Sequence, residues 1–526
     1  MISKVAIISP HGWFGQENVL GRPDTGGQIV YILDQVHALE NYLLSSLKSS
    51  GVETLPKIIV LTRLIPNNEG TRSNERLEKI NGTLNSWILR VPFKDKDMRT
   101  IPNWISRFHI WPYLEQFALD SKTELLKEFD GKPDMIVGNY SDGNLVASLL
   151  SSWLRVIQCN IAHALEKSKY LCSDLFWQDM EKDYNFSLQF TADLISMNKA
   201  DIVIASSFQE IRGTDSVLGQ YESYYLFSMP ELFKVVNGIN LFHPKFNVVS
   251  PGVNENIFFP FTKLDQRLKS RIEDLANILF EKQGNDIYGH LENPSNPPIF
   301  TMARLDKIKN ITGLVESYGQ NEELQKKANL IVIAGSIYAN NSADEEEGFE
   351  LKRMYDLIEK YHLQGKIRWL GMRISKAESG EIYRIIADKR GVFVQPALFE
   401  AFGLTVLEAM ASGLPTFATQ FGGPLEIIEN QKNGFWINPT QPGLLTAPIL
   451  QFFNTLEKRP DYWDKISKQS ILRIRKFYTW KLYSEKMIKF AKLYGFWNYS
   501  GQADEKKEID HYCNLIFHLI FKKRLK

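Results

Sequence analysis

The sequence predicts an α/β protein made of two doubly wound domains, each a parallel sheet with helices on both faces. Short β-rich runs alternate along the chain with amphipathic stretches, which is typical of parallel sheets covered by helices. More than ten such runs are too many for one compact sheet of this kind. The chain has 526 residues, of which 44% are hydrophobic and 12% aromatic, enough to build more than one large core.

The predicted strands fall into two sets along the chain. The first set covers residues 4–9, 57–62, 135–140, 155–162, 201–206 and 246–250. The second covers residues 298–304, 329–336, 366–371, 391–396, 414–419 and 434–439. Turn residues in 250–266 mark a boundary, and 461–526 has a helical pattern without further strands. We predict one Rossmann-like domain over 1–250, a second over 251–470, and C-terminal helices over 471–526 that pack back on the first domain.

Composition limits the possible functions. The 62 basic and 61 acidic residues nearly cancel, so no global charge attracts nucleic acid or a membrane surface. The three cysteines, Cys159, Cys172 and Cys513, lie far apart and form no CxxC pair, which fits a reducing compartment. No apolar run approaches the roughly 20 residues of a spanning helix, and the run in residues 1–10 is too short for a signal peptide. We expect a cytoplasmic protein that binds any anion locally.

The stretch "PDTGGQIVYILDQVHALE" places Gly26 and Gly27 at the start of a helical pattern that begins near Gln28. The first amides of a helix have no partner within the helix, and the helix dipole favours an anion there. Without β-carbons, both glycines let a ligand approach closely, and a diphosphate is the natural ligand. Such a turn is also common as a purely structural feature, so this motif alone leaves both interpretations open.

A second motif, "FVQPALFEAFGLTVLEAM", places Glu400 after a strand and Glu408 on the helix that follows. Gly403 indicates a loop before that helix. Two carboxylates in this arrangement could accept hydrogen bonds from sugar hydroxyls. Spacing alone proves little, because Glu273 and Glu281 are equally far apart in an ordinary amphipathic helix.

Cationic side chains and a histidine follow other strands. Arg304 and Lys309 come directly after a strand, where they could grip phosphate oxygens or form a solvated basic turn. His163 ends another strand and is followed by Lys169, which adds positive charge nearby. His37, in the other copy of "HALE", fits an ordinary helix position.

Two acidic stretches imitate metal sites. "DKD" at 95–97 lies in a basic polar stretch that we interpret as a loop, and "DEEEGFE" at 344–350 reads as the start of a solvated helix. The nine histidines show no HxxxH or similar spacing. We therefore expect no metal and no cofactor.

Several long blocks resemble a known family. They include "ISPHGWFGQENVLGRPDTGGQIVYILDQVHALE", "GNYSDGNLVASLL", "IAHALEKSKY", "FSLQFTADLISMN", "IFTMARLDKIKNITGLVESYG" and "FVQPALFEAFGLTVLEAMASGLPTFATQFGGPLEII". The chain resembles the sucrose synthases, retaining glycosyltransferases of the family 4 type, from about Lys4 into "YGFWNYSG" near its end. The resemblance implies the GT-B fold: two facing Rossmann-like domains, the first on the acceptor side and the second on the nucleotide-sugar side, with a C-terminal helical segment crossing back.

The resemblance also implies a reaction: sucrose and a nucleoside diphosphate, UDP or ADP, give the nucleotide glucose and D-fructose. It implies catalytic roles for His163, Arg304, Lys309 and Glu400. It implies nucleotide and diphosphate contacts from Gly26, Gly27, Gln28, Arg304, Lys309, Arg373, Ser379, Phe402, Gly403, Leu404 and Glu408. On the fructose side it implies His11, Arg107 and Lys169. Because no carboxylate nucleophile can be identified, we expect a metal-independent front-face substitution.

The chain departs from the family's pattern in three places. We expect it to correspond to the catalytic part, without the N-terminal regulatory region of long sucrose synthases, which leaves family-typical regulation, tetramer contacts and a homo-oligomer open. The stretch "GVNENIFFP" differs slightly from the family's usual acidic version, without an evident chemical consequence. Arg373 and Ser379 stand where plant enzymes have Gln and Asn near the base, so ADP could serve as well as UDP. Two alternatives stay open: a sucrose-phosphate synthase that uses fructose 6-phosphate, which "AHALEKSKY" disfavours, and a non-catalytic protein that binds nucleotide sugars.

Overall fold

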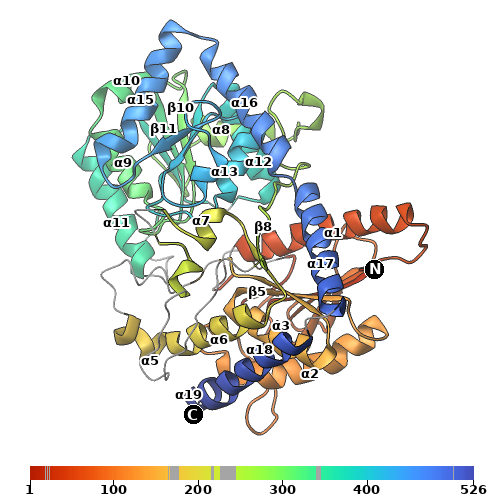
Figure 1. Cartoon of the computed structure of the whole chain (residues 1–526). Coiled ribbons are helices and arrows are strands. Elements are labelled where there is room, and N and C mark those ends of the chain that lie inside the picture. The colour runs from red at the N-terminus through yellow and green to blue at the C-terminus, as the bar shows by residue number, and fades with distance from the viewer. Residues whose placement is uncertain are drawn as a thin grey trace. The chain divides into compact units, whose positions relative to one another are not determined.

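The chain folds into two compact units in the computed structural model (Figure 1). The structure describes residues 1–526 except 18, 20, 21, 23, 26, 164, 166–176, 215–217, 225–243, 339–344, 373, 501, 502 and 526. The first unit comprises Met1–Pro251 together with Trp480–Lys526, and the second comprises Gly252–Thr479. The returning segment therefore begins at Trp480. The predicted start at residue 471 is wrong, because residues 471–477 complete a helix of the second unit.

The first unit contains an eight-stranded sheet with the order β3-β4-β2-β1-β5-β6-β7-β8. Its strands are β1 (Lys4–Ile8), β2 (Lys57–Leu64), β3 (Leu77–Lys79), β4 (Ser86–Pro92), β5 (Met135–Asn139), β6 (Ile157–Ile161), β7 (Ile202–Ala205) and β8 (Phe246–Val248). All neighbouring strands run parallel except β3, which pairs antiparallel with β4 at the edge. The six strands predicted for this half are present, whereas β3 and β4 were not predicted.

Helices cover both faces of this sheet. The described helices are α1 (Gly27–Ser49), α2 (Leu114–Phe129), α3 (Tyr140–Leu154), α5 (Glu181–Tyr184), α6 (Phe186–Lys199), α7 (Phe208–Ile211), α17 (Trp480–Ser500), α18 (Ala503–Ile516) and α19 (Lys522–Arg524). Successive strand residues alternate between faces. Ala6 and Ile8 of β1 pack in a core with α2, α3, α6 and α18, while Val5 and Ile7 pack in another with α1 and α17. The C-terminal helices thus complete both layers.

The second unit contains a seven-stranded sheet with the order β15-β14-β13-β10-β11-β12-β9. Its strands are β9 (Ile287–Tyr288), β10 (Pro298–Met302), β11 (Asn329–Ile333), β12 (Ile367–Leu370), β13 (Val392–Gln395), β14 (Thr416–Thr419) and β15 (Phe435–Ile437). The six predicted strands are present and parallel. The short edge strand β9, antiparallel to β12, was not predicted.

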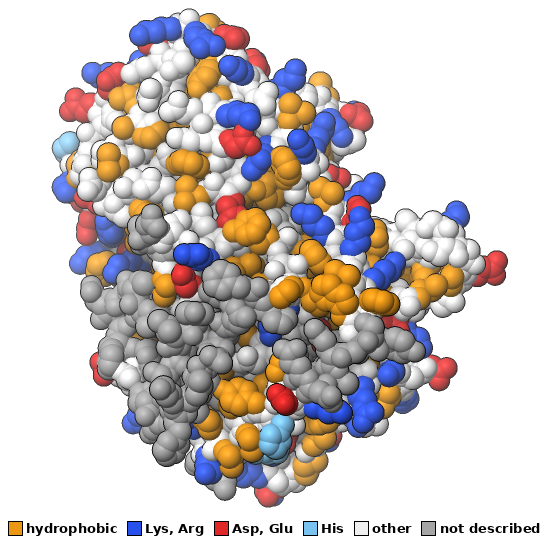
Figure 2. All heavy atoms as spheres, viewed as in Figure 1, with side chains coloured by type: hydrophobic (Ala, Val, Ile, Leu, Met, Phe, Trp, Pro, Cys, Tyr) orange, Lys and Arg blue, Asp and Glu red, His pale blue; other side chains and the backbone are white. Residues whose placement is uncertain are grey.

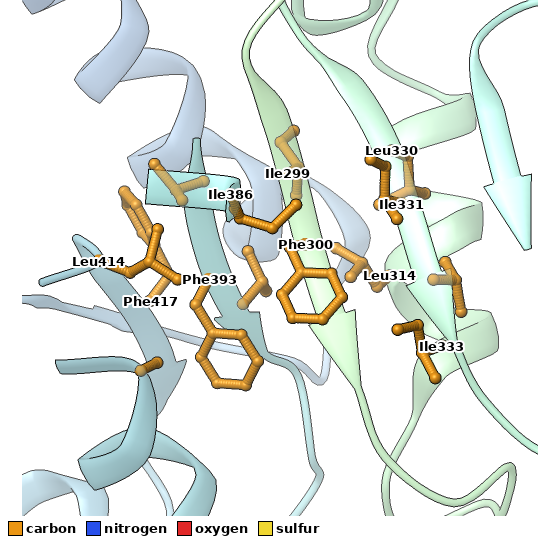
Figure 3. Close-up of a cluster of buried hydrophobic side chains, with 14 of the residues drawn as sticks. Ile299, Phe300, Leu314, Leu330, Ile331, Ile333, Ile386, Phe393, Leu414 and Phe417 are labelled. Carbon is orange, nitrogen blue, oxygen red and sulfur yellow. The ribbon is translucent and has the colours of Figure 1, made fainter. Parts of the chain in front are cut away.

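The helices of the second unit form two groups whose members pack together: α9, α10, α11 and α15 in one group, α8, α12, α13 and α16 in the other. Their bounds are α8 (Ile272–Phe280), α9 (Ile311–Gly319), α10 (Glu322–Lys327), α11 (Glu345–Lys360), α12 (Lys376–Asp388), α13 (Leu404–Ser412), α14 (Pro424–Ile427), α15 (Pro442–Lys458) and α16 (Tyr462–Phe477). Figure 3 shows Phe300 and Phe393 of adjacent strands in the buried core, with Leu314 and Ile386 from helices on either side.

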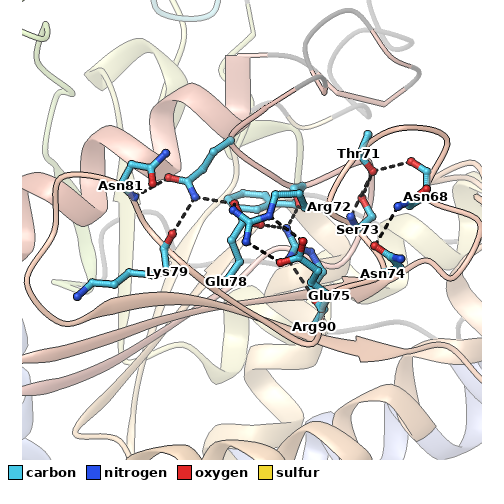
Figure 4. A network of polar contacts seen from close by, with 12 residues as sticks. Asn68, Thr71, Arg72, Ser73, Asn74, Glu75, Glu78, Lys79, Asn81 and Arg90 are labelled. Atoms are coloured by element: carbon cyan, nitrogen blue, oxygen red, sulfur yellow. Dashed lines mark hydrogen bonds and ion pairs between the residues drawn. The ribbon is translucent and has the colours of Figure 1, made fainter.

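A buried polar network fixes the loop after β1. Arg90 on β4 donates from Nη2 to Glu78 Oε2 (2.5 Å) and to the Phe14 carbonyl (3.0 Å), and both charged side chains are at most 1% exposed. Gln16 donates to Glu78 Oε1 (2.6 Å) and accepts from the Asn81 amide (2.7 Å). Figure 4 shows Arg90, Glu78 and Asn81 within this network. The sheet edge thereby holds the segment that immediately follows the loop residue His11.

We predict that Arg90→Ala lowers the free energy of unfolding by about 3–5 kcal/mol, because it leaves the buried Glu78 carboxylate with only the more distant Arg72 (3.7 Å, 44% exposed) as a cationic partner. Urea denaturation checks this value. The matched control is Arg99→Ala, since Arg99 lies 3.0 Å from Asp97 but is 76% exposed. That loss should stay below about 1 kcal/mol. Equal losses in the two variants would contradict the assigned role of the buried pair.

Candidate functional site

Polar side chains gather where three adjacent strands of the first unit end. His11 follows β1, Asn139 and Tyr140 end β5 and begin α3, and His163 follows β6. These strands are neighbours in the order β1-β5-β6. Ligands of open parallel sheets bind beyond the carboxyl ends of the strands, so this edge is a candidate binding region.

The His163 imidazole is held on several sides. Its Nε2 lies 2.7 Å from Asn139 Oδ1, its ring stacks on Tyr140 (centroids 4.7 Å apart), and Tyr31 of α1 meets it edge-on at 4.6 Å. Burial, helped by the nearby His11, lowers the pKa of His163 to about 3. The ring is therefore neutral near pH 7. Since Asn139 Nδ2 donates to the Ile8 carbonyl, Oδ1 is left to accept the Nε2 proton, and Nδ1 carries the lone pair.

Backbone strain accompanies this ring pair. Tyr140 and His163 both have φ of 59°, in the left-handed region that non-glycine residues rarely occupy. Each such residue costs roughly 1–3 kcal/mol and persists where the surrounding structure enforces it. The structure therefore maintains the stacked pair at an energetic cost.

His11 forms a buried pair with Asp142 of α3. The His11 Nδ1 lies 2.8 Å from Asp142 Oδ1, and His11 is 3% exposed. Burial opposes protonation, but the attraction and hydrogen bond of Asp142 outweigh it, so the pKa of His11 is raised. The charge of Arg107 also acts on His11, and Arg107 itself lies against Asp24, to whose carboxylate its amide donates (2.8 Å).

The start of α1 leaves room for a ligand. Gly27 is exposed, and a β-carbon added there would meet no heavy atom within 4 Å, so packing within the described chain does not require glycine. The next residue, Gln28, is 5% exposed, and its Nε2 has no hydrogen-bond partner among the described residues. Both observations fit the predicted approach of an anion to this helix end.

A second group of polar side chains lies in the second unit, where the neighbouring strands β10 and β13 end. Lys309 Nζ lies 2.8 Å from Glu400 Oε2, and Gln395 Nε2 donates to the same oxygen at 2.7 Å. Among described residues, Oε1 of Glu400 accepts no protein hydrogen bond. The Leu398 amide donates to the Ile308 carbonyl (2.8 Å), which holds the two loops together. Glu400 is thus prepared to accept a further hydrogen bond.

The helix after Glu400 begins with free amides. Gly403 has φ of 107°, which glycine adopts easily, and it caps α13 without a side-chain hydrogen bond. Phe402 is buried, and Leu404 is the first residue of the helix. The backbone of this turn therefore leads directly into the first amides of α13, which have no partner within the helix. Glu408 lies one turn further along α13 and is half-buried. The predicted loop before the helix is confirmed.

Other predicted site residues have different surroundings. Arg304 is 84% exposed and lies 3.0 Å from Asp306. Ser379 is buried in α12, where its hydroxyl donates to the Lys376 carbonyl (2.7 Å). Gly26, Lys169 and Arg373 lie outside the described residues.

The structure thus brings His11, Arg107 and His163 together in one unit and Lys309, Glu400 and the Gly403 turn together in the other. Sequence reasoning missed Asn139, Asp142, Tyr31 and Gln395. Asn139 and Asp142 had a detectable signal, because polar residues directly follow a buried strand in "MIVGNYSDGN". Tyr31 gave none, since it fits the apolar pattern of its helix, whereas Gln395, a polar residue at the end of a buried strand, gave the same kind of signal.

The described residues contain neither a helix suited to a membrane nor a cluster of metal-binding side chains. No described helix combines the length and hydropathy that a membrane crossing requires. No described group of three or more histidine, cysteine or carboxylate side chains could hold a metal ion. On the face drawn in Figure 2, basic and acidic side chains are interspersed.

Comparison with known proteins identifies two matching family models. The model described as "Sucrose synthase first GT-B domain" matches residues 1–280, and that described as "Glycosyl transferases group 1" matches residues 285–470. Among solved structures, a sucrose-phosphate synthase from Thermosynechococcus elongatus aligns with a TM-score of 0.63 at 19% identity, covering 93% of this chain and 98% of that one. The catalytic domain of starch synthase IV from Arabidopsis thaliana gives 0.61 at 14% identity, covering 94% and 99%. These likenesses show the GT-B fold.

Curated relatives match at much higher identity. Sucrose synthase from Thermosynechococcus vestitus is 57% identical and that from Melioribacter roseus 59% identical, each over 100% of this chain. Sucrose synthase 2 from Arabidopsis thaliana is 51% identical over 99% of the chain. The chain spans about 65% of the length of these relatives. Two family models match the chain, and its similarity to these proteins extends over 99–100% of its own length. The chain therefore belongs to the sucrose synthase family.

Proposed function

We propose that the chain catalyses a reversible glucosyl transfer in which sucrose and a nucleoside diphosphate give the nucleotide glucose and D-fructose. The observation that carries this proposal is the 57–59% identity to sucrose synthases over the whole chain. The two groups of polar side chains support it, because one suits a nucleotide sugar and the other suits an uncharged sugar acceptor.

The nucleotide sugar binds to the second unit. Lys309 leaves Glu400 to bind the diphosphate, and Arg304 exchanges its exposed contact with Asp306 for a phosphate oxygen. Surface ion pairs are worth at most about 1 kcal/mol, so this exchange costs little. Glu400 then accepts a hydrogen bond from a glucose hydroxyl, and Glu408 accepts from the ribose. These two cations provide the positive charge for the departing diphosphate, so we propose that no metal ion takes part.

The turn before α13 supplies backbone donors. The uncapped amides from Leu404 onward, together with the helix dipole, stabilise negative charge. Gly403, in the left-handed conformation, is the N-cap of this helix and lies three residues after Glu400. We also propose that Gly26, Gly27 and Gln28 of the first unit contact the diphosphate.

Fructose binds to the first unit beside His11, Arg107 and Lys169, and His163 faces the transferred glucosyl group. In the synthetic direction the leaving diphosphate oxygen takes the proton of the fructose hydroxyl on the same face of the sugar. The transition state has positive charge on the glucosyl ring, which a protonated imidazole would repel. The low pKa of His163 keeps its ring neutral and so avoids this repulsion.

The experiment that tests the proposal supplies the purified chain with UDP-glucose or ADP-glucose and with fructose or fructose 6-phosphate. The proposal expects free sucrose from fructose with at least one donor. Product from fructose 6-phosphate alone would support the sucrose-phosphate synthase alternative, and no transfer with any combination would support a binding protein. Comparing the two donors in one assay also gives the nucleotide preference.

We predict that Glu400→Ala lowers kcat at least about tenfold, a loss of about 1.4 kcal/mol of transition-state stabilisation, because a glucose hydroxyl loses its acceptor. Steady-state kinetics of sucrose cleavage measure this. The control is Glu281→Ala, an exposed carboxylate just beyond α8, which should keep the wild-type rate. Wild-type kcat in a folded Glu400→Ala protein would refute the assignment.

Arg304→Ala should lower kcat/KM for the nucleotide about tenfold or more without changing the melting temperature, because its side chain is 84% exposed in the protein alone. Initial rates at varied UDP and ADP, with a thermal melt, test both parts. Arg390→Ala serves as the control, because it removes an arginine that is 53% exposed and paired with Asp464. Equal kinetic effects of the two substitutions would argue against a phosphate contact.

The His11–Asp142 pair predicts a pH dependence of stability. Because the pKa of His11 is raised in the folded protein, its contribution is complete below the ordinary histidine pKa of about 6.5 and is lost as pH rises through the raised value. Asp142→Asn removes this contribution. The difference in free energy of unfolding between wild type and Asp142→Asn should therefore shrink as the pH rises above the ordinary histidine pKa of about 6.5. A difference that stays constant in urea denaturation above that pH would contradict the prediction.

A further inference from the structure

The neighbours of His163 come from two sources. Asn139 and Tyr140 lie next to each other where β5 passes into α3, so the local chain path places them. Tyr31 comes from the second turn of α1 and meets the imidazole edge-on, with ring centroids 4.6 Å apart and planes at 90°. Tyr31 is 5% exposed, so its contact with the imidazole is part of the buried structure.

The hydroxyl of Tyr31 is held by the returning helix α17. It donates to the Tyr483 hydroxyl oxygen at 2.9 Å, and Gln35 Nε2 donates to that same oxygen at 2.6 Å. The Trp480 ring contacts Tyr31 at 5.3 Å and Tyr483 at 5.0 Å. We call Tyr31, Trp480 and Tyr483 the aromatic brace. In Figure 1, α17 lies beside α1, in agreement with these contacts.

Polar groups make the brace specific in a way that apolar packing would not. Tyr483 is 1% exposed and Gln35 is fully buried, so each lost hydrogen bond would leave a buried polar group without a partner. Burial raises the pKa of Tyr31 well above its usual value, so its hydroxyl stays protonated as a donor. A donor and an acceptor of fixed position allow one orientation of the Tyr31 ring, whereas two phenylalanines would leave that orientation free.

The brace begins where the chain re-enters the first unit. Thr479 is the last residue of the second unit and Trp480 the first of the returning segment. The first turn of α17 therefore supports a ring that itself contacts His163. The apolar side chains of Met487, Ile488 and Ala491 already anchor α17 in the core. The buried polar network is therefore additional to the packing that holds this helix.

We propose that Tyr31 and Tyr483 are positioning residues for His163: Tyr483 fixes the Tyr31 ring, and that ring fixes the plane of the imidazole. Both residues are buried, Tyr31 at 5% and Tyr483 at 1% exposure, so in this proposal they act through His163 and not by contact with a substrate. The inference rests on the proposed function for its kinetic consequence, while the effect on the imidazole itself can be observed in the protein without any substrate.

The test compares four variants of the full chain. Tyr31→Leu removes the ring, Tyr31→Phe keeps the ring but removes the donor, and Tyr483→Phe removes the acceptor. The matched control is Tyr494→Phe, because Tyr494 lies on the same helix, is 7% exposed and donates its hydroxyl to the Pro244 carbonyl. The control removes a buried phenol hydrogen bond outside the brace.

Two readouts are measured for each variant: kcat and KM for sucrose cleavage, and the ¹⁵N–¹H NMR signals of the His163 ring in the protein without ligand. We expect Tyr31→Leu to lower kcat about tenfold or more and Tyr31→Phe and Tyr483→Phe about threefold or more, with KM for the nucleotide within about twofold of wild type. We expect Tyr31→Leu to shift the His163 signals away from the single Nε2-protonated form. Tyr494→Phe should keep wild-type kcat and wild-type His163 signals.

The two readouts separate the possible failures. Unchanged His163 signals in Tyr31→Leu would overturn the inference, whatever the kinetics show. A kcat loss in Tyr494→Phe equal to that in Tyr483→Phe would also overturn it, because the effect would then be general to the helix. If Tyr31→Leu does not fold, Tyr31→Phe and Tyr483→Phe take its place. The inference then fails if both variants keep the wild-type His163 signals. A wild-type chain without sucrose turnover would refute the proposed function, but the NMR comparison would still test the positioning of His163.

Discussion

The candidate donor site depends on one contact, the pairing of Lys309 with Glu400 at the carboxyl ends of two adjacent strands. The strands β10 and β13 are far apart in the sequence, and their parallel pairing brings the two loops together. The 2.8 Å contact, with Gln395 on the same carboxylate oxygen, neutralises a half-buried charge until a ligand arrives. In the proposed function a diphosphate binds the cation and a sugar hydroxyl binds the carboxylate, so the pair would separate when the ligand binds.

In the first unit, two nearby histidines differ in their protonation. His11, which meets Tyr140 edge-on, is paired with a carboxylate that favours its protonated form, whereas His163, which stacks on Tyr140, remains neutral. Two imidazoles near one tyrosine therefore have opposite protonation preferences, set by Asp142 for one and by burial for the other. This division suits a site that must bind a polar sugar beside a group that develops positive charge.

Much of the fold could be predicted from the sequence because the strands of doubly wound sheets are continuous apolar runs. The strands that were missed, β3, β4 and β9, show why the prediction was incomplete. β3 and β9 are short antiparallel edge strands, and β4 has a buried arginine within its apolar run. Arg90 makes that strand look half-polar in sequence, although its charge is neutralised by Glu78 across the hairpin. The start of the returning helices was also misplaced, since no turn signal marks the passage from Thr479 to Trp480.

Site residues that follow strands were predictable by type, because a cation, carboxylate or histidine after an apolar run points to the binding edge of the sheet. The pairing of these residues was not predictable: Asn139 and Asp142 follow a strand and so had a signal, but their contacts with His163 and His11, like the contact of Tyr31, depend on the spatial order of strands and helices. The residue roles themselves remain predictions, supported by geometry within each unit and by membership of the sucrose synthase family.

The central claim is a glucosyl transfer from sucrose to a nucleoside diphosphate that retains the α-configuration of the sucrose donor. The most direct measurement follows the purified chain with sucrose and UDP or ADP by ¹H NMR and records the anomeric configuration of the new glucosyl phosphate from its first appearance. The account predicts nucleotide glucose with the α-configuration of the sucrose donor, formed together with an equal amount of fructose. A β-configured first product, or release of free glucose in place of nucleotide glucose, would contradict it.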